Sequence, residues 1–181
     1  SEAMRRKNML FVDMARRHFF AQLLDGGFKT DRDIRENAKQ IELEFPTGSY
    51  ALAKWDLSSG APLVPGEMER ALSHIDGAMA IQNEPESAIF IIFTQQQKLA
   101  DNVDALAKAL GREFFAMGVS GLHIDLSEFS TAMDEALHTL EYSRLNGKNS
   151  ICLYSDLKPP LRKEAVLLPP ASLQQVLERL L

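Results

Sequence analysis

The stretch that decides the fold runs from residue 115 to residue 157 and reads FAMGVSGLHIDLSEFSTAMDEALHTLEYSRLNGKNSICLYSDL. It predicts a short apolar strand over 116–120, then a helix, then a second strand over 150–154. The helix has an apolar face at spacings of three and four, formed by Phe129, Met133, Ala136, Leu137 and Leu140. Asn146-Gly147 ends this helix, because glycine adopts a left-handed C-terminal conformation at little cost.

The chain before this stretch alternates between strand and helix patterns. Strands are predicted over 50–57, 78–82 and 88–94, and helices over 67–75 and 97–115. The run over 89–93 is continuously apolar, which is typical of a central strand covered on both faces. Residues 83–87 (NEPES) join the second and third strands, so we expect these strands to form a hairpin.

Capping residues and charges characterise three of the predicted helices. Thr30 is expected to cap a helix that carries Asp31 and Asp33 in its first turn, where the helix dipole favours anions. Ser127 or Ser130 is placed to cap the helix of the opening stretch. The first predicted helix, over 4–24, is basic, with Arg5, Arg6, Lys7, Arg16 and Arg17. A solvated face of a packed helix, a juxtamembrane segment and a partner-pairing helix all fit this pattern.

The order of elements from Tyr50 predicts an α+β fold. Strand, helix, strand, strand, helix, strand, helix, strand fits a two-layer ferredoxin-like sheet with helices on one face. We divide the chain into an N-terminal helical extension (1–46), an α/β domain (47–157), and a linker with a C-terminal helix (158–181).

The predicted C-terminal helix, residues 171–181, has an apolar stripe that must bury against something. The N-terminal helix, a second subunit and a further domain are the three candidates. Because the sequence stops within this apolar pattern, we expect the 181 residues to be a fragment of a longer protein.

Composition narrows the class of protein. With a net charge of −5, the chain lacks the excess of basic residues that is typical of a nucleic-acid binder. The single cysteine, Cys152, is expected to be a small core residue; one cysteine excludes an intrachain disulfide and fits a reducing compartment. No apolar run approaches the length of a membrane span, so we expect a cytoplasmic location, with an upstream membrane anchor of the full-length protein left open.

The opening stretch resembles the end of the degenerate GGDEF-like domain found inside some AraC-type bacterial transcription regulators. The matching residues are Gly118, Val119, Ser120, Ala132, Ala136, Leu137, Gly147, Ile151, Tyr154 and Asp156. Upstream, Leu23-Leu24-Asp25-Gly26 followed by a helix over 30–45 matches the arrangement that precedes the first strand in that family. The resemblance implies a nucleotide-cyclase-like core with a regulatory role, a homodimer, and DNA binding through a domain absent from this chain.

The resemblance also locates where cyclase chemistry would lie. An active diguanylate cyclase carries its signature in the hairpin, where glycines admit the nucleotide and carboxylates hold metal ions. Here residues 83–87 contain a proline and no glycine. Asp56 alone stands at the position of a family metal ligand, and Glu84 and Glu86 could join it, although carboxylates in turns are usually solvated. We therefore expect no enzyme activity, no catalytic residues, no metal site and no cofactor.

One further pair of residues suits acid–base chemistry. The four histidines lie in different elements, with no pair at metal-ligand spacing. His123, in the loop after the 116–120 strand, has Asp125 two residues further on. A polar loop pair is the simpler interpretation of these two residues.

Two functional hypotheses follow. The first is a regulatory module that dimerises or relays a signal to DNA-binding helices outside this chain. The alternative is a small-molecule or nucleotide sensor that uses the degenerate cyclase cleft beside Asp56 and residues 83–87, with a ligand that the sequence does not specify. An enzyme with the cyclase fold is the weakest reading, because the signature is missing.

Overall fold

The computed structural model describes residues 1–147 and 149–157, so the predicted linker and helix over 158–181 lie outside the described residues. The elements, in chain order, are α1 (Glu2–Leu24), α2 (Asp31–Gln40), β1 (Tyr50–Ser59), α3 (Glu67–Leu72), β2 (Ala78–Glu84), β3 (Ser87–Phe93), α4 (Gln96–Leu110), β4 (Phe114–Val119), the 3-10 helix η1 (Leu126–Glu128), α5 (Phe129–Leu145), β5 (Ser150–Leu153) and the 3-10 helix η2 (Tyr154–Asp156). The predicted order of strands and helices from Tyr50 onward is confirmed.

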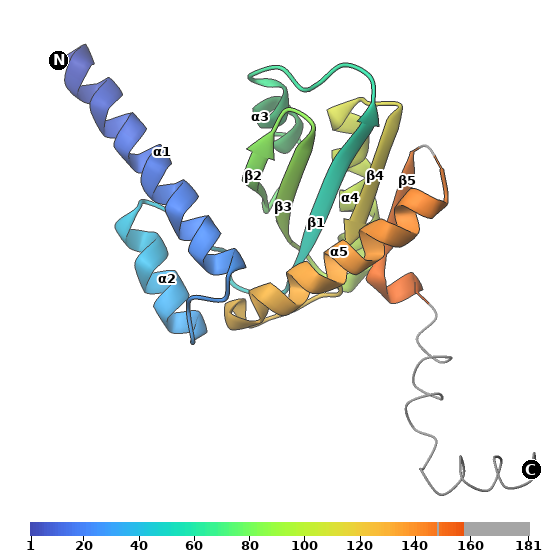
Figure 1. Ribbon diagram of the computed structural model, residues 1–181. Coiled ribbons are helices and arrows are strands. Elements are labelled where there is room, and N and C mark those ends of the chain that lie inside the picture. The colour runs from blue at the N-terminus through green and yellow to red at the C-terminus, as the bar shows by residue number, and fades with distance from the viewer. Residues whose placement is uncertain (148, 158–181) are drawn as a thin grey trace, which may run out of the picture.

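The strands form one five-stranded sheet in the order β2-β3-β1-β4-β5 (Figure 1). β1 lies at the centre, antiparallel to β3 on one side and to β4 on the other. β2 and β3 are the predicted hairpin, and β5 pairs with β4 in parallel. Two strand–helix–strand crossings interleave around β1, which confirms the predicted α+β, ferredoxin-like class.

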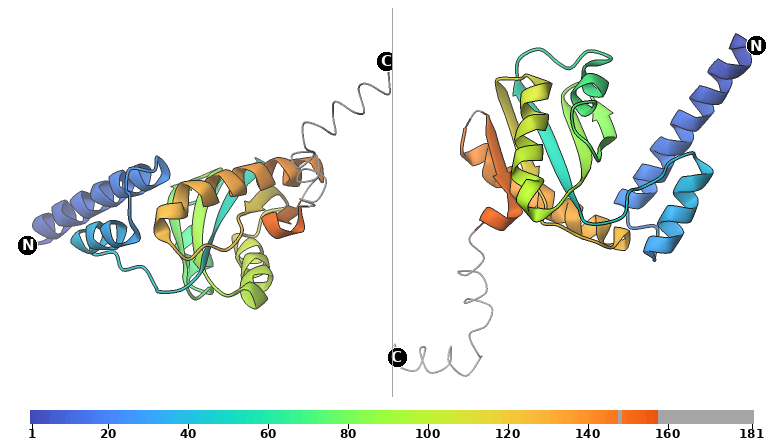
Figure 2. Two further views of the ribbon diagram at one scale, coloured as in Figure 1. Left: turned by 90° about the horizontal axis from the view of Figure 1, so that it is seen from below. Right: turned by 180° about the vertical axis from the view of Figure 1, so that it is seen from behind.

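Helices cover both faces of the sheet, so the expected two-layer arrangement with helices on one face is wrong. Side chains alternate along a strand. Ala51, Ala53 and Trp55 of β1 therefore face the core under α3 and α4, whereas Tyr50 and Leu52 face the core under α1, α2 and α5. In the left view of Figure 2 the strands lie between α5 and α4. The apolar run of β3, predicted to be covered on both faces, contributes to both cores.

Three predicted boundaries or positions shift in the structure. α4 ends at Leu110, because Gly111 follows with a left-handed φ of 65° and stops the helix. Phe114 and Phe115 therefore belong to β4 and not to a helix ending at 115. Leu137, expected on the buried face of α5, is 42% exposed. Cys152 is half-buried and not a core residue, because β5 is an edge strand.

One of the two predicted helix caps is present in the structure. Thr30 accepts a hydrogen bond from the Asp33 backbone N–H and caps α2, as expected. Neither Ser127 nor Ser130 caps α5. Instead, Asp125 accepts a hydrogen bond from the Ser127 N–H and begins η1, which runs directly into α5. A 3-10 turn ahead of the helix thus moves the capping residue upstream.

The N-terminal half of α1 extends away from the sheet, while its C-terminal end packs against the domain (Figure 1). Phe19, Phe20 and Leu23 are its buried residues. Within the described residues, no helix is both long enough and apolar enough to cross a membrane.

β4 and α5 approach closely at Gly118. A Cβ atom at this position would overlap the carbonyl oxygen of Ala136 and the backbone nitrogen of Leu140. Both obstructing atoms belong to the backbone of α5, so neither can rotate aside as a side-chain end would. A glycine here is therefore a packing requirement between the strand and the helix.

We predict that Gly118→Ala lowers the free energy of unfolding by about 3 kcal/mol, because α5 must shift away from the sheet. Urea unfolding followed by circular dichroism measures this change. Gly121→Ala is the matched control. Its Cβ would meet Glu135 Oε2 at 3.3 Å, a side-chain atom that can move, so we expect a loss below about 1 kcal/mol. Equal losses for the two variants would contradict the close approach at Gly118.

Candidate functional site

A cluster of charged side chains surrounds Asp56, near the end of β1 and beside the hairpin. Asp56 Oδ1 accepts hydrogen bonds from Lys54 Nζ at 2.9 Å and from Ser87 Oγ at 2.8 Å. Asp56 Oδ2 accepts one from Arg144 Nη2, near the end of α5, at 2.5 Å. Lys54 also donates to Ser87 Oγ. The β1–β3 register places Asp56 opposite Ser87, which explains why the hairpin supplies one of these donors.

Two cations neutralise the Asp56 carboxylate. Burial by itself favours the protonated acid, but the bonds from Lys54, Ser87 and Arg144 outweigh burial and hold the pKa of Asp56 below its ordinary value. Both side chains of the Lys54–Asp56 pair are mostly buried, with exposed fractions of 15% and 22%. Asp56 is therefore an ionised carboxylate with its hydrogen-bonding capacity committed to protein donors.

Neither of the other two carboxylates considered for this cleft is among the partners of Asp56, which are Lys54, Ser87 and Arg144. Glu84 and Glu86 are exposed in the hairpin, and Glu84 accepts a hydrogen bond from Gln82 Nε2 at 3.3 Å. Across residues 1–147 and 149–157, no three His, Cys, Asp or Glu side chains are grouped so that they could hold a metal ion. Asp56 is thus surrounded by cations, the opposite of what a divalent metal requires.

A second polar cluster lies in the loop between β4 and α5, around His123. Its Nδ1 is 2.8 Å from Glu128 Oε2, and its Nε2 is 3.0 Å from Glu135 Oε2. The expected His123–Asp125 pair is not formed, because the Asp125 carboxylate caps η1 through the Ser127 N–H. Two glutamates, five and twelve residues further along the chain, take its place.

The two glutamates shift the proton affinity of the His123 ring. Burial opposes a positive charge on the imidazole, but the contacts with Glu135 and Glu128 outweigh burial and raise the pKa of His123 above its ordinary value. The ring therefore carries its proton to a higher pH than a solvent-exposed histidine does.

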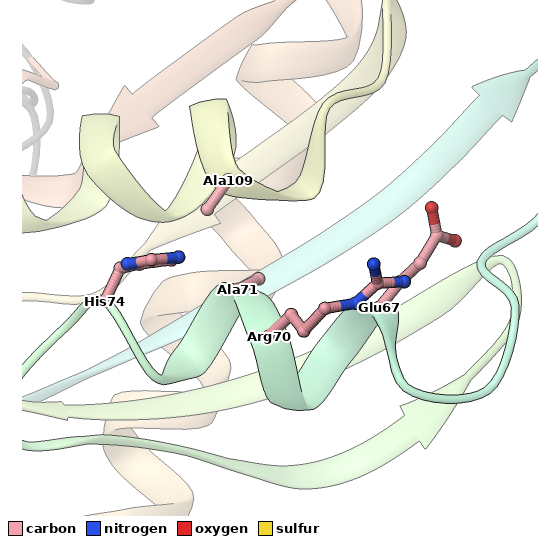
Figure 3. A pocket seen from close by; sticks show the side chains of 5 residues that line it. All are labelled: Glu67, Arg70, Ala71, His74 and Ala109. Carbon is pink, nitrogen blue, oxygen red and sulfur yellow. The ribbon is translucent and has the colours of Figure 1, made fainter.

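A shallow pocket of about 240 Å³ lies between α3 and α4 (Figure 3). It is lined by Glu67, Arg70, Ala71, His74 and Ala109. The Glu67 carboxylate is bonded to Arg112 and to the Val64 N–H, each at 2.7 Å. Because α3 and α4 cover the sheet face opposite α5, this pocket is separated by the sheet from the Asp56 cluster.

Sequence reasoning found Asp56 and His123 but missed the residues that decide their chemistry. Lys54 could have been recognised, since it lies two residues before Asp56 in a strand and so shares its face. Arg144 and Glu135 carried no such pattern, because they reach these clusters from another element, α5.

We predict that Asp56→Asn lowers the free energy of unfolding at pH 7 by about 2 kcal/mol, because it leaves Lys54 largely buried without a counter-charge. The folded-state pKa of Asp56 lies below the unfolded value, so this contribution is present above about pH 4 and is lost as the pH falls through the folded-state pKa. Chemical denaturation of the parent and the variant at pH 7 and at pH 3 measures the loss of unfolding free energy at each pH. Glu86→Gln, in the exposed turn, is the control and should leave the free energy of unfolding unchanged at both pH values. An equal loss at both pH values for Asp56→Asn would refute the ion pairing.

No protein-family model and no curated protein matches the sequence. Solved structures that are similar to it include the following two. The diguanylate cyclase SiaD, in complex with its activator SiaC from Pseudomonas aeruginosa, is 14% identical and aligns over 84% of this chain and 67% of its own, with a TM-score of 0.51. An EAL/GGDEF domain protein from M. capsulatus is 12% identical over 59% of this chain and 85% of its own, with a TM-score of 0.43. The chain therefore has the GGDEF-like fold of diguanylate cyclases.

Proposed function

We propose that this chain is the regulatory, non-catalytic portion of an AraC-type bacterial transcription regulator, in which a GGDEF-like domain dimerises and relays a signal. DNA is contacted by a domain outside these residues. The observation that carries the proposal is the state of Asp56, which is bound by Lys54 and Arg144 where a cyclase would need a carboxylate free to hold a metal ion.

The hairpin supports the same conclusion. Guanine-nucleotide binding by a cyclase needs a backbone that the substrate can approach, which glycines allow. Here the turn carries Pro85 and Glu86, and the Pro85 carbonyl oxygen accepts a hydrogen bond from the Leu63 N–H at 2.8 Å. The β1–α3 loop therefore packs against this turn, so access for a substrate is reduced.

The N-terminal half of α1 provides the surface for dimerisation. Met4, Leu10, Phe11 and Met14 are each at least 65% exposed. At 3.6 residues per turn they share one side of the helix, with Met4 and Phe11 seven residues apart and Met14 three further on. This is the spacing with which one helix packs against an identical helix, so a second copy of this chain is the occupant that fits.

The sensing alternative has one structural observation, the pocket between α3 and α4 (Figure 3). At about 240 Å³ it is slightly smaller than the roughly 300–1,000 Å³ of typical small-molecule sites. It lies across the sheet from Asp56, so it gives no support to a ligand in the cleft beside Asp56 and the hairpin. We therefore favour the relay.

We expect the purified protein to form no cyclic dinucleotide when it is incubated with GTP and Mg²⁺ or Mn²⁺. Chromatography of the reaction products, beside an authentic diguanylate cyclase as positive control, measures this. Product formation that disappears in the Asp56→Asn variant would establish cyclase activity and overturn the non-catalytic assignment. The variant separates activity of this chain from activity of a contaminant.

We also expect the chain to dimerise with increasing concentration and Met14→Glu to shift the equilibrium to monomer, because the new charge would be buried in the α1 interface. Light scattering or sedimentation over a range of concentrations measures the change. Met9→Glu is the matched control: Met9 is 67% exposed but lies on another side of α1, so this variant should dimerise as the parent does. A parent protein that stays monomeric, or equal effects of the two substitutions, would refute dimerisation through this face.

A further inference from the structure

The loop between β4 and α5, residues 120–128, connects elements on the α5 side of the sheet. His123 and Tyr50 exchange two backbone hydrogen bonds, each of 2.8 Å, which tie the loop to the start of β1. The Leu126 N–H donates to Asp31 Oδ1 at 2.8 Å, which ties the loop to the first turn of α2. A change in the conformation of this loop therefore affects β1, α2 and α5 together.

The His123 side chain closes this loop onto α5. Its ring is 12% exposed and lies between Glu128 of η1, which is 54% exposed, and Glu135 of α5, which is 17% exposed. Glu135 Oε2 also accepts the Gly121 N–H at 2.9 Å. One carboxylate oxygen of α5 thus holds both ends of the segment from Gly121 to His123.

We propose that His123 is a proton-controlled clamp, which holds the β4–α5 loop and α2 against α5 when the ring is protonated and releases the η1 side of the loop when the proton is lost. An imidazolium has two N–H groups and can donate to Glu128 and Glu135 at once. A neutral imidazole has one N–H, so its other nitrogen presents a lone pair to a carboxylate. One of the two contacts must then open.

The surroundings decide which contact opens. Glu135 is mostly buried and keeps the Gly121 N–H as a second donor, so it remains close to the ring. Glu128 is exposed and can exchange the ring for water, which makes its contact the weaker one. Loss of the proton therefore frees Glu128 and loosens η1, whose Leu126 N–H holds Asp31 of α2.

The charged groups that face the ring are acidic. Glu128 from η1 and Glu135 from α5 contact the ring directly. Asp125 of the loop and Asp31 of α2 act on the neighbouring Tyr50. From β1 comes Tyr50, whose phenol donates to the Asp125 carbonyl oxygen and whose pKa is raised by burial and by these carboxylates, so it stays neutral. This acidic setting favours the imidazolium. The clamp's stabilisation is fully present below the unfolded pKa of about 6.5 and disappears as the pH rises through the higher folded-state pKa.

As a regulatory device the clamp rests on the proposed relay function, because this loop joins α2, through Asp31, to the start of α5. The clamp itself can be tested independently of the relay. Its failure would appear in the titration and exchange measurements below, whereas failure of the relay would appear in the oligomeric state and the nucleotide assay.

The test is a nuclear magnetic resonance titration of the four histidine rings between pH 5 and 9, combined with amide hydrogen exchange corrected for the intrinsic rate. We expect His123 to titrate above the ordinary histidine pKa of about 6.5. Above the pKa of His123, the protection of the Leu126 and Ser127 amides should fall about tenfold, the equivalent of one charge-assisted hydrogen bond.

Two variants make the result decisive. Glu128→Gln should lower the pKa of His123 and remove most of the pH dependence of exchange at Leu126, since the contact that opens has been weakened in advance. Asp134→Asn, a charge-matched change at an exposed position of α5, should leave both unchanged. The clamp is overturned if His123 titrates at or below the ordinary histidine pKa of about 6.5, or if the protection of the loop does not depend on pH in the parent protein.

Discussion

The structure depends on one strand that is buried on both faces and bonded along both edges. β1 forms ladders with β3 and β4, so its backbone groups are satisfied within the sheet. Its side chains alternate between two cores, Tyr50 and Leu52 on one side and Ala51, Ala53 and Trp55 on the other. An apolar strand of this kind needs helices over both faces, which is why α3 and α4 lie on one side of the sheet and α1, α2 and α5 on the other.

Charges enter this framework at two places on the α5 face, near the two ends of β1. Toward the C-terminal end of β1, the side chains of Lys54 and Asp56 are mostly buried. A buried ion pair is tolerated only when its remaining hydrogen-bonding groups are satisfied. Arg144 and Ser87 satisfy them. At its start, Tyr50 is bonded to the backbone of His123, whose ring contacts Glu135. α5 is thus attached to β1 at two points, through His123 at Glu135, near the middle of the helix, and through Asp56 at Arg144, near its C-terminal end. The close approach at Gly118 lies between them.

This arrangement gives the proposed relay a physical basis. A helix fastened at two points to the central strand moves with the sheet as one body, so motion is expected at the parts that are less firmly attached. α1 is such a part, because its buried residues are confined to its C-terminal end. The β4–α5 loop is where α2 meets α5, through Asp31 and the Leu126 N–H. A change in α1 would therefore reach α5 directly, where the two helices pack together, and also through α2 and this loop.

The sequence by itself determined the strands, the hairpin, most helices and the cap at Thr30, because each depends on side chains within a few residues of one another. It also pointed to Asp56 and His123 as residues of interest. Only the tertiary structure decided that helices cover both faces of the sheet, that Asp125 and not a serine begins the turn into α5, and that Arg144 neutralises Asp56 from 88 residues away. The physical reason is the range of the interactions: periodicity and capping are local, whereas the chemistry of a buried charge depends on whichever partner the packed chain brings within hydrogen-bonding distance.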